Sequence, residues 1–166
     1  SSPGLRLTRS RKVATSWQVD PHAPQPRVHY LSNGHYSILI TATGGGYSAW
    51  EDIDLTRWRP DATLDNWGTW IYIQDQESGA TCSSGIQPSL VVADEQEVLF
   101  NSHFVEFRRQ DGLLAQATQV FVAPLDDVEI RQVTLTNLGD QPRRLRLTSY
   151  GEVILAPQVA DSRHPA

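Results

Sequence analysis

Residues 113–137, LLAQATQVFVAPLDDVEIRQVTLTN, indicate the fold of this 166-residue chain more clearly than any other stretch. Leu113 to Ala123 and Val128 to Asn137 are short runs rich in β-branched and other apolar residues. Pro124 lies between them, where a turn residue separates neighbouring strands. Neither run has the 3.6-residue rhythm of a helix, so the stretch predicts two long β-strands joined by a short connection.

The same organisation recurs along most of the chain. Asn33-Gly34 and Asp111-Gly112 are strong turn signals, and Tyr36, Ile38 and Ile40 alternate as one buried face of a strand. Further strands are predicted at Ile71-Tyr72-Ile73, Glu97–Phe100, His103–Arg109 and Arg143–Leu155. Many strands without a long helix between them predict an all-β fold, a large antiparallel β-sandwich.

Two strands carry finer predictions. In the Val128 strand the apolar positions are 128 and 130, then 133 and 135, which predicts a β-bulge near Arg131-Gln132. In the last strand Leu145, Leu147, Val153 and Leu155 fall on one face, so we expect a single strand with one wet and one apolar face.

Composition divides the chain and limits its partners. Residues 1–27 are rich in proline and basic residues and are predicted to be a linker or edge segment, with a possible strand at Leu5–Thr8, whereas residues 28–166 form the sandwich domain. The net charge is −5 and no apolar stretch is long enough for a transmembrane helix, so we expect neither nucleic acid nor direct membrane contact. The sequence does not begin with methionine, which suggests a fragment of a larger multidomain enzyme.

Residues 44–70 contain the materials of a sugar site. Gly44, Gly45 and Gly46 precede Tyr47 and Ser48, and four of the five tryptophans follow, with Arg57 and Arg59 among them. Flat apolar rings and forked cations suit a sugar ring and its hydroxyl groups. The structural alternatives are a sharp bend at the glycines and core packing of the tryptophans. Trp67, in a turn-like context, is the better candidate for exposure, and Trp58 is core if both arginines face a pocket.

Catalytic and metal-binding patterns are lacking. Glycosidic bond cleavage needs a carboxylic acid of raised pKa and often a second carboxylate, but no pair stands out. The acidic candidates are Glu51, Asp52, Asp54, Asp61 and Asp65. The five histidines are scattered, and the single Cys82 excludes an intrachain disulfide. We therefore expect no catalytic residue, no metal and no cofactor in this chain.

Several ordered motifs resemble the N-terminal β-sandwich of glycoside hydrolase family 94, which includes cellobiose and chitobiose phosphorylases and the C-terminal region of cyclic β-1,2-glucan synthases. The motifs are Gly45-Gly46-Tyr47-Ser48, Leu55-Thr56-Arg57-Trp58-Arg59, Asp65-x-x-Gly68, Trp70-Ile71-Tyr72-Ile73-x-Asp75, Gly85-x-Gln87-Pro88, Val133–Asn137 and Leu147-Thr148-Ser149-Tyr150-x-Glu152-Val153. The residues 31–34 and 156–166 look most like the cyclic β-1,2-glucan synthase branch.

The resemblance implies a galactose-mutarotase-like supersandwich packed against an (α/α)6 barrel that holds the catalytic acid. It implies a non-catalytic module whose loops contribute to a sugar cleft for a β-glucan or gluco-oligosaccharide, or to contacts with a second subunit. It also implies a cytoplasmic domain of a bacterial parent protein at the inner membrane. By motif match the cleft candidates are Tyr47, Ser48, Arg57, Arg59, Asp65 and Trp67.

Two other interpretations stay open at this point. A freestanding carbohydrate-binding module would stack sugars on exposed tryptophans, and Trp67→Ala would weaken its binding. A purely structural module would expose an apolar patch where its neighbour packs. The family resemblance predicts that the chain alone does not turn over β-1,2-gluco-oligosaccharides with phosphate.

Overall fold

The computed structural model describes residues 16–59, 64–157 and 159–160. The described residues form thirteen strands, all paired antiparallel, so the predicted all-β antiparallel fold is confirmed. The strands are β1 (Ser16–Val19), β2 (Val28–Ser32), β3 (Tyr36–Thr41), β4 (Gly46–Trp50), β5 (Ile53–Thr56), β6 (Trp70–Asp75), β7 (Thr81–Ser83), β8 (Glu95–Asn101), β9 (Val105–Asp111), β10 (Leu114–Val122), β11 (Glu129–Asn137), β12 (Leu145–Tyr150) and β13 (Val153–Ala156).

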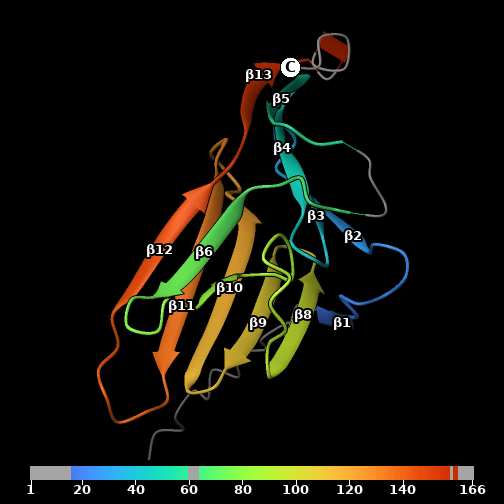
Figure 1. Ribbon diagram of the computed structural model, residues 1–166. Helices are drawn as coiled ribbons and strands as arrows, with labels where there is room; N and C mark the ends of the chain where they lie inside the picture. Colours follow the sequence, from blue (N-terminus) through green and yellow to red (C-terminus); the bar gives the residue numbers. More distant parts are fainter. Residues whose placement is uncertain (1–15, 60–63, 158, 161–166) are drawn as a thin grey trace, which may run out of the picture.

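The strands make three sheets arranged in two layers (Figure 1). Sheet A has the order β1-β8-β9-β10-β11, sheet B the order β13-β5-β4-β3-β2, and sheet C the order β12-β6-β7. Sheet A is one layer, and sheets B and C lie over it side by side. No helix within the described ranges has the length and apolar character needed to cross a membrane.

The main core lies between sheets A and B. Tyr36, Ile38 and Ile40 of β3 are buried, as their alternation predicted. They belong to one cluster with Val98 and Phe107 of sheet A. The β2–β3 hairpin is closed by the predicted Asn33-Gly34 turn, where Asn33 Oδ1 accepts the Tyr36 N–H at 2.8 Å and Gly34 adopts a φ of 103°.

The predicted bulge near Arg131-Gln132 is wrong. β10 and β11 pair without interruption from Leu114 opposite Asn137 to Val122 opposite Glu129. The apolar phase changes because Glu129 and Arg131 are polar residues on the inner face, while Ile130 is on the outer face and 38% exposed. Polar residues on the inner face of a strand therefore shift the apolar pattern of the sequence in the same way as an inserted residue would.

The predicted single strand Arg143–Leu155 is also wrong. The chain leaves sheet C after Tyr150 and enters sheet B at Val153, so β12 pairs with β6 and β13 pairs with β5. Leu147, Val153 and Leu155 are 48%, 68% and 65% exposed. The apolar residues of this segment thus lie on two strands, and three of the four that were predicted to share one buried face are exposed.

The N-terminal segment contributes β1, an edge strand that pairs with β8 through the register Trp17 opposite Phe100. The strand predicted at Leu5–Thr8 lies outside the described residues.

Candidate functional site

The glycine run forms the turn between β3 and β4. Thr41 N donates to Gly45 O at 2.8 Å and Gly44 N donates to Thr41 O at 3.0 Å. Gly44 and Gly46 have φ values of 106° and 140°, which favour glycine over residues with a side chain. The glycines are therefore a sharp bend, as the structural alternative proposed.

The segment around Asp65 and Trp67 packs directly on this turn. Gly46 N donates to Trp67 O at 2.8 Å, and a Cβ added to Gly45 would lie 2.6 Å from Asp65 Oδ1. The Thr43 hydroxyl donates a hydrogen bond to the Asp65 carboxylate. Asp65 therefore fixes the turn, and glycine at position 45 is what permits the close approach.

Arg59 and Trp67 form a cation–π pair beside the turn. The guanidinium carbon of Arg59 lies 5.4 Å from the centroid of the Trp67 ring. Arg59 is exposed and Trp67 is half-buried, partly by its contact with the turn. Such a pair contributes roughly 0.5–1 kcal/mol at an exposed site and fixes the orientation of both groups.

Tyr47 and Trp58 form a second aromatic pair. Their ring centroids are 5.5 Å apart at an interplanar angle of 37°, and both residues are half-buried. Burial, and after it the charge of Asp54, raises the pKa of Tyr47, so the phenol keeps its proton and can donate a hydrogen bond at neutral pH. Trp58 is half-buried and packs on Tyr47.

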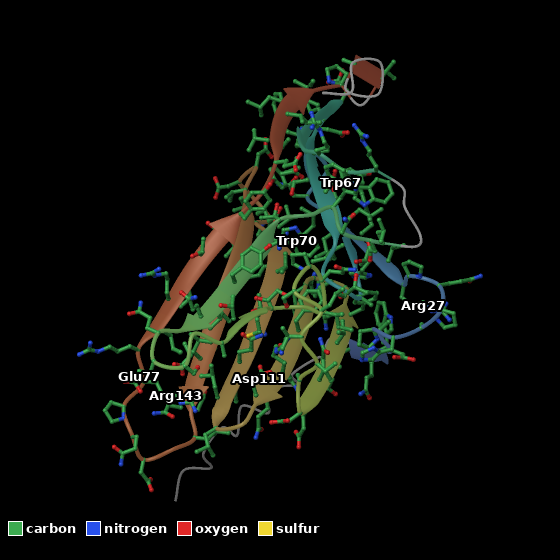
Figure 2. All side chains as sticks on the ribbon, viewed as in Figure 1. Arg27, Trp67, Trp70, Glu77, Asp111 and Arg143 are labelled. Carbon is green, nitrogen blue, oxygen red and sulfur yellow. The ribbon has the colours of Figure 1, made fainter. Side chains whose placement is uncertain are left out.

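The two pairs are joined only through the backbone, because Trp58 and Arg59 are consecutive residues whose Cα atoms lie about 3.8 Å apart. We call Tyr47, Trp58, Arg59 and Trp67 the loop surface. Figure 2 shows Trp67 above Trp70, which begins β6. Of these two tryptophans only Trp70 is a core residue, with 5% of its surface exposed.

Arg57 does not join the loop surface. Its backbone N donates to Glu152 O at 2.9 Å, and its guanidinium lies 3.4 Å from the Glu152 carboxylate. The residue ties the end of β5 to the residue that precedes β13. Its described contacts are those of a structural residue at the junction of two strands.

Ser48 points to the opposite face of β4 from Tyr47, because successive side chains alternate along a strand. It is 3% exposed, and its hydroxyl donates to the Glu129 carboxylate. Glu129 also pairs with Arg131 Nε at 2.5 Å, and Arg131 Nη1 donates to Thr69 O at 2.7 Å. This network links sheet B, sheet A and the segment that leads into sheet C.

The network borders a cavity of about 420 Å³ between the sheets, lined mainly by hydroxyl groups. Burial, and then the Glu129 charge, raises the pKa of Tyr36 on its wall. Glu129 and Arg131 are not among the site residues predicted from the sequence, although their odd-numbered positions place them on the inner face of β11. The six predicted residues therefore divide between the loop surface, the turn, the β5–β13 junction and this open pocket between the sheets.

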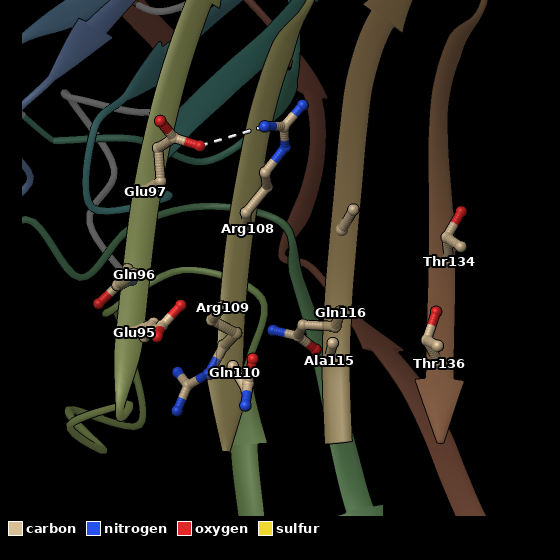
Figure 3. Close-up of a pocket in the computed structure, with 11 residues that line it drawn as sticks. Glu95, Gln96, Glu97, Arg108, Arg109, Gln110, Ala115, Gln116, Thr134 and Thr136 are labelled. Atoms are coloured by element: carbon tan, nitrogen blue, oxygen red, sulfur yellow. Dashed lines mark hydrogen bonds and ion pairs between the residues drawn. The ribbon is translucent and has the colours of Figure 1, made fainter. Parts of the chain in front are cut away.

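A larger cavity of about 510 Å³ lies along β8, β9, β10 and β11 (Figure 3). Small residues such as Ala115 and Thr134 line it, with the ion pair of Glu97 and Arg108 at 3.2 Å. Among the described residues that line it, none is aromatic. It therefore offers hydrogen bonds but no stacking platform.

The acidic candidates do not assemble into a catalytic pair in the described residues. Glu51 and Asp52 are exposed, Asp65 is bound by Thr43, and Asp61 lies outside the described residues. Backbone N–H groups of Ser78 and then Glu77 lower the pKa of Asp75, the opposite of what a general acid requires. Within the same residues, no group of three or more His, Cys, Asp or Glu side chains could hold a metal ion.

Comparison with known proteins decides the family. A model described as the glycosyl hydrolase 94 supersandwich domain matches residues 11–166. This chain belongs to the glycosyl hydrolase 94 supersandwich family. The resemblance drawn from the ordered motifs is therefore confirmed.

Several curated proteins are similar to this supersandwich domain. The chain is 38% identical over 146 residues to the cyclic beta-(1,2)-glucan synthase NdvB of Rhizobium meliloti, covering 88% of this chain and 5% of that protein. It is 29% identical over 150 residues to the N,N'-diacetylchitobiose phosphorylase of Vibrio furnissii, covering 87% and 19%. It is 33% identical over 128 residues to a 3-O-beta-D-glucopyranosyl-beta-D-glucuronide phosphorylase of Paenibacillus borealis, covering 76% and 16%. The chain thus spans less than a fifth of each of these relatives.

Proposed function

We propose that this domain is the non-catalytic supersandwich module of a larger family 94 protein that acts on β-linked glucans, and that its loop surface lines part of the sugar cleft. The observation that carries the proposal is the presence of two aromatic pairs at neighbouring positions of the chain, Arg59 over Trp67 at 5.4 Å and Tyr47 against Trp58 at 5.5 Å. The 38% identity to a cyclic beta-(1,2)-glucan synthase supports a β-glucan as the substrate class.

The chemistry of the loop surface suits a saccharide. A pyranose ring has an apolar C–H face that packs on an aromatic ring, and hydroxyl groups that accept from a guanidinium fork. The protonated Tyr47 phenol adds a donor. These side chains carry no acid positioned for bond cleavage, which supports a binding role over a catalytic one.

We also propose that the module packs against a catalytic (α/α)6 barrel of the parent or against a second subunit. Exposed apolar residues support this contact. Leu147 and Tyr150 of β12 and Val153 and Leu155 of β13 are each about half or more exposed. Apolar side chains concentrated on neighbouring strands are typical of a surface that a partner covers. We place the module in the cytoplasm, within a parent at the bacterial inner membrane.

A freestanding carbohydrate-binding module is less well supported. The family match and the small share of each relative that the chain spans, 5% to 19%, favour a module of a larger protein instead. In the proposed arrangement the catalytic barrel supplies the other side of the cleft.

Substitutions in the loop surface test the proposal in the full-length protein. Arg59→Ala and Trp67→Ala are expected to raise KM for β-1,2-gluco-oligosaccharides about tenfold with kcat changed much less, because they remove uniform binding. Steady-state kinetics on the purified variants would measure both constants.

Arg144→Ala is the matched control, because Arg144 is exposed in the β11–β12 connection and belongs neither to the loop surface nor to the apolar positions of β12 and β13. It is expected to leave both constants unchanged. Normal KM values in Arg59→Ala and Trp67→Ala, with only a lower melting temperature, would show that the loop surface is structural and would overturn the proposal.

A further inference from the structure

Trp17 lies outside the loop surface, on the edge strand β1. It stands opposite Phe100 of β8 and is 47% exposed. Val19, two residues further along and on the same face of the strand, is buried in the core. Trp17 therefore lies at the edge of the core, with one part of its ring packed and another part exposed to solvent.

The packed part of the ring is held by two aromatic neighbours. His29 of β2 and Phe100 meet Trp17 at 79° and 85°, with centroid distances of 5.4 and 6.3 Å. His29 stacks on Phe100 at 4.9 Å, and its Nε2 lies 2.7 Å from Asn101 O. These contacts fix the Trp17 ring before any ligand arrives, which lowers the entropic cost of binding.

A cavity of about 470 Å³ opens beside Trp17, between β1 and the segment that leads to β2. Val19 and Phe100 are apolar lining residues, whereas Gln18, Asp20 and Arg27 are polar ones. Its lining mixes apolar and polar groups, which suits a ligand that combines hydroxyl groups with an apolar C–H face.

The polar side chains of this cavity are accessible to a ligand. Asp20 and Arg27 are exposed, and Asp20 Oδ1 accepts the His22 N–H at 2.8 Å. The ion pairs within residues 16–59 and 64–157 do not include Arg27. One carboxylate and one guanidinium beside an apolar ring do not favour an anion, but they match the acceptors and donors of sugar hydroxyls.

We propose that this cavity is a second saccharide-binding site, in which a neutral pyranose unit packs its C–H face on Trp17 and directs hydroxyl groups to Asp20 and Arg27. It is built from β1, β2 and β8, whereas the loop surface is built from β4 and the β5–β6 connection. The site would hold a glucan chain at the edge of the module. The inference does not depend on the role proposed for the loop surface.

The test is a titration of the ¹⁵N-labelled chain with methyl β-D-glucopyranoside and with a β-linked glucose disaccharide. The indole N–H signals of the five tryptophans are separate reporters of the two surfaces. We expect saturable shifts of Trp17 and of backbone signals near residues 18–28, and roughly tenfold weaker binding in Trp17→Ala. Trp17→Phe keeps an aromatic face and should lose less.

Substitutions of the exposed polar residues Asp20 and Arg27 keep the test informative if Trp17→Ala fails to fold. Arg27→Ala and Asp20→Asn should each weaken binding several-fold with an unchanged melting temperature, and Trp67→Ala should leave the Trp17 shifts unchanged. The proposal would be overturned if no saturable shifts appeared around Trp17. It would also be overturned if Arg27→Ala and Asp20→Asn bound the sugar as tightly as the unmodified chain. Shifts confined to Trp58 and Trp67 would also overturn it while supporting a role for the loop surface.

Discussion

Replacing Gly46 with alanine is expected to lower the free energy of unfolding by about 3 kcal/mol or more. Gly46 has a φ of 140°, and a Cβ at this position would overlap the Leu39 carbonyl oxygen and lie 2.8 Å from the carbonyl carbon. These atoms belong to the neighbouring strand β3, which pairs with β4 through Ile40 opposite Gly46. The clash therefore cannot be relieved without separating two strands of sheet B. Urea unfolding of the chain, followed by tryptophan fluorescence, would measure the loss.

Gly79→Ala is the matched control for Gly46→Ala. Gly79 also has a positive φ, 74°, but a Cβ added there meets no atom within 4 Å. Its substitution should cost only the backbone strain, about 1–2 kcal/mol. Equal losses in the two variants would contradict the steric argument, because strain alone would then account for both.

Arg109→Met is expected to cost about 2–3 kcal/mol of stability, because it removes a buried guanidinium and leaves the half-buried Asp111 carboxylate and carbonyl oxygens without their donor. The Arg109 side chain is fully buried, and its Nε and Nη2 donate to the two oxygens of Asp111 at 2.7 and 2.6 Å. It also donates to carbonyl oxygens of the β7 region, including Ser83 O at 3.2 Å. Burial lowers the pKa of Arg109, but the Asp111 hydrogen bond and the charge interactions with Cys82 and Asp111 together outweigh burial, so the pKa is raised. Arg109 thus joins sheet A to sheet C.

The same exchange at an exposed position separates this effect from a general effect of removing arginine. Arg146→Met, on the exposed side of β12, should change stability by less than about 0.5 kcal/mol. Chemical denaturation of both variants gives the comparison. A loss below about 1 kcal/mol in Arg109→Met would show that the buried pair is replaceable by an apolar side chain.

Local patterns predicted the strands and turns well. Alternation placed Tyr36, Ile38 and Ile40 on the buried face of β3, and the Asn33-Gly34 pair marked its hairpin. These features depend on neighbours close in the sequence. The break between β12 and β13 depends instead on which sheet each strand joins, and that choice is made by contacts with β5 and β6 that lie far away in the sequence.

The candidate site was harder to predict for the same reason. Tyr47 and Ser48 are adjacent in sequence, yet one faces Trp58 and the other faces Glu129, 81 residues later. The sequence around Glu129 and Arg131 predicts a bulge that the structure lacks, because a polar pair on an inner face interrupts the apolar pattern as an extra residue would. Trp17 lies in the segment predicted to be a linker or edge, so it is not among the site residues predicted from the sequence.

The central claim is that this supersandwich module binds or supports but does not catalyse. The most direct test incubates the purified chain with β-1,2-gluco-oligosaccharides and inorganic phosphate and follows sugar 1-phosphate by ³¹P NMR, with the full-length protein assayed in parallel. We predict no sugar 1-phosphate from the chain alone. Sustained release that scales with the concentration of the chain would contradict the account.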